Sequence, residues 1–140
     1  MAGLRVGWGY GSKDIINYLN QVKPPFNINS PALSAAEAAI KDSAWLNKEV
    51  KHVNKWNEKF YKEFKKLNIV TNKSFTNFLL INFDKIKKNS NKVFRLLVNS
   101  GIFVRKMNIY GIKNSLRVTI GKSDENKKLI LKIKKAINVW

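Results

Sequence analysis

Apolar residues recur at the three- and four-residue spacing of an α-helix along much of this 140-residue chain. The longest such pattern runs from Ser43 to about Leu67, and lysines and glutamates occupy its opposite side. Further helices are predicted over 14–22, over 30–41, from Asn89 or Ser90 onward, and from Ser123 onward. The pattern therefore predicts a chain rich in amphipathic helices.

Five shorter segments carry residues that favour β-strands. They cover 4–10, 69–71, 78–83, 102–106 and 116–120. In the last of them Leu116, Val118 and Ile120 share one face, and Arg117 and Thr119 share the other. A strand of this kind buries its apolar face in a core and lets Arg117 point into a cleft.

The order of these elements predicts the class of fold. From residue 43 onward it is a long helix, two strands, a helix, two strands and a helix. This order is typical of an α+β domain in which helices cover one face of a small, mainly antiparallel sheet. The preceding residues, a strand and two helices, fit that unit poorly and are expected to end another domain. The predicted domains are therefore 1–42 and 43–140.

The formal net charge of +18 arises from 27 lysines and arginines against 9 aspartates and glutamates. Such a charge is typical of proteins that bind nucleic acids. The lysines are spread along the whole chain, however, and no nucleic-acid-binding motif accompanies them, so a biased composition is the simpler explanation. Nucleic-acid binding is therefore kept as an alternative.

Other features of the sequence bear on disulfides, metal sites and the location of the protein in the cell. The chain has no cysteine, which excludes disulfides and thiolate metal ligands, and no metal site is expected. The longest apolar run, at 78–81, is far too short to span a bilayer. The chain does not open with the basic and apolar segments of a secretory signal. These features predict a cytoplasmic protein.

The arginines stand out because the chain uses lysine almost everywhere else. There are four of them: Arg5, Arg95, Arg105 and Arg117. Arginine presents a planar fork of donors that holds a carboxylate or phosphate by two parallel hydrogen bonds, which lysine cannot do. The arginines are therefore candidate binding residues for anionic ligands, except Arg95, which matches no motif and is interpreted as a solvated helix residue.

Four motifs, the last of them divided over two segments, resemble those of one family of enzymes. The segment 2–10, with the letters GLRVG around Arg5, resembles the stretch after the cofactor-binding lysine of fold-type I pyridoxal-phosphate (PLP) aminotransferases. Histidinol-phosphate aminotransferases of this class show motifs similar to Pro25–Ser30, to Lys73–Phe78, and to Gly101–Arg105 followed by Leu116–Gly121. The motifs occur in the family's order across nearly the whole chain, which makes the resemblance much stronger than any one of them alone.

The resemblance implies roles for three arginines. Arg5 matches the arginine that pairs with the phosphate of PLP, Arg117 the one that binds the substrate α-carboxylate, and Arg105 the one that contacts the substrate phosphate. The Schiff-base lysine of the family corresponds to a position upstream of Met1, so no catalytic residue is expected in this chain.

Other residues with reactive or aromatic side chains are expected to have structural roles and no catalytic role. Lys13 follows the arginine motif instead of preceding it, and is expected at the surface. His52 has no ligand-type neighbours in the sequence and is expected to be exposed. Most of the aromatic residues of the long helix, among them Phe60 and Phe64, are expected in the core.

The resemblance therefore implies the C-terminal fragment of a histidinol-phosphate-type aminotransferase, with a small C-terminal domain preceded by a remnant of the large α/β domain. The complete enzyme would transfer an amino group between histidinol phosphate or an aromatic amino acid and a 2-oxo acid, in histidine biosynthesis. This chain alone is expected to be inactive and, because family members are dimers, to form a homo-oligomer. The alternatives are one half of a split aminotransferase and a basic nucleic-acid-binding module that reuses the small domain.

Overall fold

The computed structural model describes residues 1–138, and its contacts divide the chain into two units. The first unit is Met1–Lys48 and the second begins at Glu49. The division falls inside the long helix α3 (Ser43–Lys66), which is continuous in the structure. None of the helices among residues 1–138 combines the length and the hydrophobicity that crossing a membrane requires.

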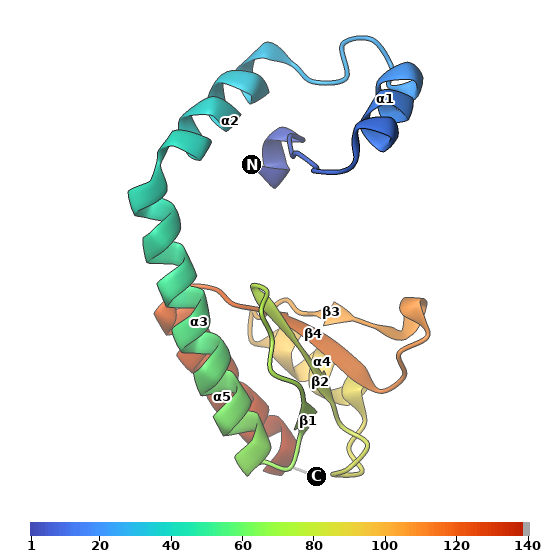
Figure 1. Ribbon diagram of the computed structural model, residues 1–140. Coiled ribbons are helices and arrows are strands. Elements are labelled where there is room, and N and C mark those ends of the chain that lie inside the picture. Colours follow the sequence, from blue (N-terminus) through green and yellow to red (C-terminus); the bar gives the residue numbers. More distant parts are fainter. Residues whose placement is uncertain (139–140) are drawn as a thin grey trace. The chain divides into compact units, whose positions relative to one another are not determined.

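The second unit contains a four-stranded antiparallel sheet (Figure 1). Its strands are β1 (Val70–Thr71), β2 (Phe78–Asn82), β3 (Arg105–Lys106) and β4 (Ser115–Thr119), in the order β1-β2-β4-β3. In the central pair, Leu79 lies opposite Val118 and Ile81 lies opposite Leu116, and all four side chains are buried. Alternation along β2 and β4 therefore places one apolar face of the sheet in the core.

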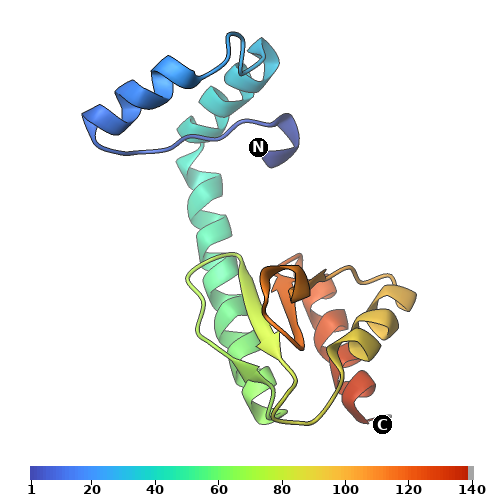
Figure 2. The ribbon, with the colours of Figure 1, turned by 90° about the vertical axis from the view of Figure 1, so that its right-hand side faces the viewer.

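Three helices cover that apolar face (Figures 1 and 2). They are the C-terminal part of α3, then α4 (Ser90–Asn99) and α5 (Ser123–Asn138). Phe60 and Phe64 of α3 are fully buried, as their helical spacing predicts, and Ile133 of α5 packs into the same core. Burying each such side chain contributes about 1.5–3 kcal/mol. The predicted α+β layer of helices on an antiparallel sheet is confirmed.

The end of α4 directs the chain toward β3. Gly101 adopts a left-handed backbone with φ of +71°, as its position after the helix predicts. Its N–H donates to the carbonyl of Val98, and the N–H of Ile102 donates to the carbonyl of Leu97. This pair of bonds closes the helix end and begins the extended segment that leads to Arg105.

Two strand predictions differ from the structure. Ala2–Leu4 forms a short 3-10 helix, and no strand follows it over the predicted range 4–10. A strand requires a partner, and the described part of the first unit contains no other strand with which it could pair. The strand predicted over 102–106 is reduced to Arg105–Lys106, because only these two residues pair with β4.

The first unit carries two helices, α1 (Lys13–Val22) and α2 (Ser30–Lys41). The residue that caps α2 is Asn29, because its side chain accepts a hydrogen bond of 2.8 Å from the N–H of Ala32. Ala32 is also the only buried residue among the described side chains of Met1–Lys48. This unit therefore lacks a hydrophobic core of its own within the described residues.

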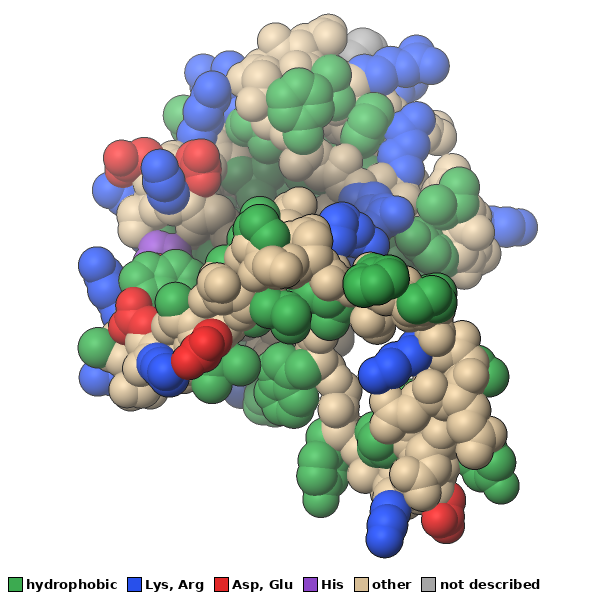
Figure 3. Space-filling view, turned by 90° about the horizontal axis from the view of Figure 1, so that it is seen from above, with side chains coloured by type: hydrophobic (Ala, Val, Ile, Leu, Met, Phe, Trp, Pro, Cys, Tyr) green, Lys and Arg blue, Asp and Glu red, His purple; other side chains and the backbone are tan. Residues whose placement is uncertain are grey.

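The apolar side chains of the first unit are instead largely exposed, and Figure 3 shows hydrophobic side chains at the surface among lysines and arginines. Those of α1 recur on one side of the helix, at Ile15, Tyr18, Leu19 and Val22. Exposed faces of this kind commonly mark contacts with another chain or domain.

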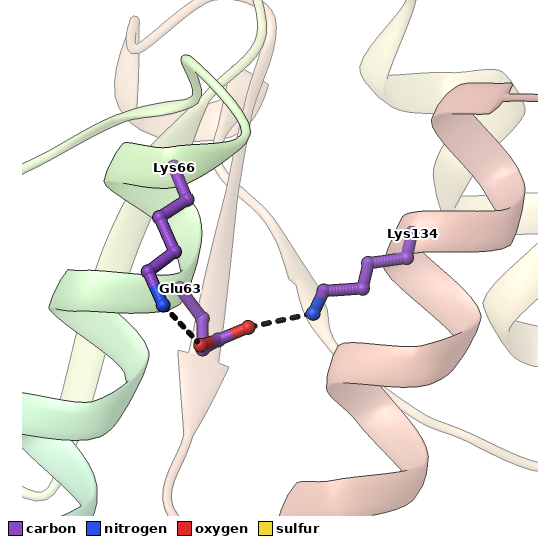
Figure 4. Close-up of polar contacts among 3 residues, drawn as sticks. All are labelled: Glu63, Lys66 and Lys134. Atoms are coloured by element: carbon purple, nitrogen blue, oxygen red, sulfur yellow. Dashed lines mark hydrogen bonds and ion pairs between the residues drawn. The ribbon is translucent and has the colours of Figure 1, made fainter.

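An ion-paired glutamate joins α3 to α5 (Figure 4). One carboxylate oxygen of Glu63 lies 2.6 Å from Nζ of Lys134, and the other lies 3.4 Å from Nζ of Lys66. The hydrogen bond from Lys134 is the main cause that lowers the pKa of the Glu63 carboxyl below its ordinary value, against a smaller opposing effect of burial. The Glu63 side chain is only 19% exposed, so solvent screens this pair less than the surface pairs.

Replacement of Glu63 by glutamine is therefore expected to lower the free energy of unfolding by about 0.5–1.5 kcal/mol at pH 7. Because the folded-state pKa is lowered, the ionised carboxylate stabilises the fold above the ordinary glutamate pKa of about 4.3, and this contribution is lost as the pH falls through the folded-state value. Urea unfolding at pH 7 and at pH 3 measures the difference, which should shrink at the lower pH.

The matched control is Glu58→Gln, which removes the same charge from the exposed pair of Glu58 with Lys62 in the same helix. Its effect should stay below about 0.5 kcal/mol at both pH values. Equal losses in the two variants at pH 7 would show that general charge, and not the bridge between α3 and α5, accounts for the effect.

Candidate functional site

The second face of the sheet, which points away from the helices, carries the candidate arginines. Arg117 of β4 lies opposite Leu80 of β2 on one side and opposite Arg105 of β3 on the other. The three residues thus form one cross-strand row on this open face. Like charges directly opposite one another are unfavourable in a sheet, so the arrangement favours an anionic ligand beside them.

Arg117 is the more constrained of the two arginines. Its side chain is half-buried, and its Nε atom is buried without a hydrogen-bond partner. Its guanidinium carbon lies 4.8 Å from the ring centre of Phe78. A buried donor without an acceptor costs about 1–3 kcal/mol or more when charged, a cost that a ligand oxygen would remove.

Arg105 lies at the exposed edge of the same face. Its guanidinium carbon is 5.4 Å from the ring centre of Tyr110, which belongs to the 3-10 turn η2 (Asn108–Tyr110). Gly111 closes this turn with φ of +73°. Arg105 is thus held by one aromatic contact and solvated elsewhere, which suits a residue that contacts the outer part of a ligand.

The third predicted residue, Arg5, belongs to the first unit, whereas Arg105 and Arg117 belong to the second. Its side chain is exposed and its backbone is left-handed, with φ of +58°. Few residues other than glycine adopt this conformation. The exposed guanidinium has the donor chemistry that a phosphate group requires.

His52 contradicts its predicted exposure. It is half-buried, and its Nε2 atom lies 2.9 Å from the carbonyl oxygen of Gly121, at the end of β4. The side chain of Asn126 also binds both the N–H and the carbonyl of Gly121. His52 therefore helps to hold the end of the strand that carries Arg117, a role that depends on a partner 69 positions away.

The sequence interpretation identified both arginines of the open face but missed their aromatic neighbours. Phe78 belongs to the Lys73–Phe78 motif, and the two-residue period of β2 places it on the same face as Leu80, the partner of Arg117. That register could have been proposed from the alternating pattern of both strands. Tyr110 lies in a turn, where no periodic signal locates a side chain.

Known proteins are similar in sequence to this chain over nearly its full length. Residues 1–133 match the family model described as aminotransferase class I and II. The chain is 44% identical to a histidinol-phosphate aminotransferase of Pelagibacter ubique over 99% of this chain and 39% of that protein. It is 36% identical to one of Nitrobacter hamburgensis, over 91% of this chain and 35% of that protein.

Solved structures share the fold. A histidinol-phosphate aminotransferase from Sinorhizobium meliloti, solved in complex with pyridoxal-5'-phosphate, superposes with a TM-score of 0.83 at 18% identity, over 99% of this chain and 38% of that one. One from Clostridium acetobutylicum gives a TM-score of 0.79 at 23% identity, over 91% and 39% of the two chains.

The chain thus spans about two fifths of the length of the relatives that it matches. Within that span the agreement extends from the segment around Arg5 to the last helix. The resemblance seen in the motifs is confirmed, and this chain belongs to the aminotransferase class I and II family.

Proposed function

We propose that this chain is the C-terminal portion of a histidinol-phosphate-type aminotransferase. The complete enzyme would transfer an amino group between histidinol phosphate or an aromatic amino acid and a 2-oxo acid. The observation that carries the proposal is the open face of the sheet, where Arg117, with an unpartnered buried Nε, stands beside Arg105. The 44% identity to the Pelagibacter relative supports the choice of substrate class.

Each arginine has a role in this proposal. Arg117 holds the α-carboxylate of an amino-acid substrate, because its half-buried fork can offer two parallel donors to a carboxylate. Arg105, at the exposed end of the same row, contacts the substrate phosphate. Arg5 pairs with the phosphate of PLP, as its exposed guanidinium allows. PLP, when bound, withdraws electrons from the substrate's α-carbon.

The residues that we assign to this site among positions 1–138 are arginines, which supply binding groups and transfer no proton. Arginines remain protonated at all physiological pH values and cannot exchange a proton with a substrate. His52 lies against Gly121, where it holds a strand end, and Lys13 lies at the exposed start of α1. We therefore propose that the chain is inactive alone and works with the remaining portion of the enzyme, whether on the same polypeptide or on a separate one.

The two-domain description is part of the same proposal. Residues 1–42, with Arg5, would be the end of a large cofactor-binding domain, and residues 43–140 a small domain that carries the substrate arginines. Contacts divide the chain into two units, and the described side chains of the first unit form no hydrophobic core, which supports this description.

The proposal is tested in a chimera that joins this chain to the part of the Pelagibacter relative that it does not match. The chimera should convert histidinol phosphate in the presence of 2-oxoglutarate, and the chain alone should not. Arg105→Ala should lower kcat/KM for histidinol phosphate by about 10- to 150-fold, the effect of losing a charge-assisted contact of about 1.5–3 kcal/mol. Turnover of phenylalanine should fall far less.

Arg95→Ala is the matched control, because Arg95 is an exposed arginine of α4 away from the open face. Equal losses on histidinol phosphate and phenylalanine in Arg105→Ala would refute the phosphate role and favour an aminotransferase of broader specificity. A chimera that binds PLP but converts neither substrate would refute the proposed reaction.

A further inference from the structure

Phe78 shares the open face of the sheet with Arg117. It pairs with Thr119 across β2 and β4, two pairs along the strands from the pairing of Leu80 with Arg117. Phe78 and Arg117 are therefore diagonal neighbours on one face, within reach of long side chains. The guanidinium carbon of Arg117 is 4.8 Å from the ring centre, inside the distance over which a cation is attracted to an aromatic face.

The backbone that carries this ring is itself anchored. The hydroxyl of Ser74 donates a 2.6 Å hydrogen bond to the carbonyl of Phe78, which closes the turn before β2. The N–H of Ile120 donates to the carbonyl of Asn77 at 2.8 Å and attaches the same point to the end of β4. The ring therefore projects from a fixed position at the start of a central strand, and not from a mobile loop.

The guanidinium carbon of Arg117 lies over the Phe78 ring, and this contact limits the orientations that the group can adopt. The donors of arginine lie in its plane, so a ring against the face blocks no donor and restricts the tilt of the plane. Nε of Arg117 is buried and lacks a partner. With the plane held, Nε and one terminal nitrogen can face the same pair of oxygens.

We propose that Phe78 is a positioning residue for the substrate carboxylate: its ring orients the guanidinium of Arg117 for a bidentate contact. The inference rests on the proposed function, because it takes from there the role of Arg117 in binding a carboxylate. It adds a residue whose side chain need not touch the ligand, and it gives the phenylalanine of the Lys73–Phe78 motif a function.

The chain offers two internal controls. Phe75 is a phenylalanine of the loop before β2 and is 98% exposed, so its replacement removes an equal ring without disturbing Arg117. Arg105 lies over a different ring, that of Tyr110, and should not respond to changes at residue 78.

The experiment observes the arginine Nε–Hε signals of the 15N-arginine-labelled 140-residue chain by NMR. Arg→Lys variants assign the signals of the four arginines. Chloride is replaced stepwise by acetate at constant ionic strength, in the parent chain and in Phe78→Leu, Phe78→Tyr and Phe75→Leu. The shift of the Arg117 signal yields the dissociation constant for the carboxylate probe. Dispersed amide signals verify folding, and Phe78→Met replaces Phe78→Leu if the latter unfolds the chain.

Phe78→Leu is expected to weaken acetate binding at Arg117 by about 2- to 10-fold, the range of a cation–π contact at a partly exposed site. It should also shift the Arg117 signal, because the ring current is lost, and speed the exchange of its Hε with water. Phe78→Tyr, which keeps the ring, should stay within about 2-fold of the parent, as should Phe75→Leu. At each acetate concentration the Arg105 signal should have the same position in Phe78→Leu as in the parent.

The outcomes separate the inference from the function on which it rests. If Arg117 of the parent chain responds to acetate and Phe78→Leu binds acetate as the parent does, the positioning role is wrong and the carboxylate role stands. If Arg117 of the parent chain does not respond to acetate, the carboxylate role fails and the inference fails with it.

Discussion

Arg117→Lys, in a complete enzyme that contains this chain, is expected to lower kcat/KM for amino-acid substrates by about 30- to 1,000-fold. This corresponds to about 2–4 kcal/mol of lost transition-state stabilisation. PLP binding, measured by absorbance after dialysis, should persist, because the proposed phosphate anchor is Arg5. The chimera with the Pelagibacter relative is the enzyme in which to measure both quantities.

The structure gives the reason why lysine cannot replace this arginine. Nε of Arg117 is a buried donor without a hydrogen-bond partner, and a lysine side chain has no nitrogen at that position. A lysine ammonium is a point charge that cannot form two parallel bonds with a carboxylate, nor stack its plane on the Phe78 ring. The variant therefore keeps the positive charge but loses the planar pair of donors.

The control substitution is Arg95→Lys, which makes the same chemical change at an exposed position of α4. It should leave kcat/KM within about 2-fold of the parent, as surface changes away from a site usually do. An Arg117→Lys enzyme with parent-like kcat/KM on every amino-acid substrate would show that Arg117 does not bind the carboxylate.

The 140-residue chain by itself is expected to self-associate at 0.15 M salt. On α1 alone, Ile15, Tyr18, Leu19 and Val22 are all exposed. Burying such a side chain contributes about 1.5–3 kcal/mol. Repulsion between copies of charge +18 opposes association, but salt screens it over about 8 Å. Burial should prevail, and sedimentation velocity over a range of concentrations should show a dimer or larger species.

A pair of double variants tests the contribution of α1. Ile15→Lys with Leu19→Lys places two charges on the apolar side and should weaken association by roughly 100-fold or more. Asn17→Lys with Asn20→Lys adds the same two charges on the opposite side of α1 and should change association far less. A parent chain that sediments as a monomer and unfolds cooperatively would contradict the prediction, since it would mean that the first unit has found its own core.

The sequence by itself determined the elements whose signal is local and repeated. The period of α3 and the alternation in β2 and β4 predict their ranges closely, because one buried face imposes a spacing on the apolar residues. Glycine is favoured where a helix ends in a left-handed residue, and Gly101 occupies that position after α4. The motifs likewise identified the family and indicated Arg105 and Arg117 as candidate binding residues.

Tertiary structure alone decided the features that join distant segments. The segment 4–10 has the composition of a strand, but strand formation depends on a partner that composition does not reveal. His52 finds the carbonyl of Gly121, and Glu63 finds Lys134, only after α3 packs beside the end of β4 and α5. The pairing of Arg105 with Arg117 and the contact with Phe78 depend on the register of three strands. Register is a property of chain pairing, and it decided which candidate binding residues meet on one face.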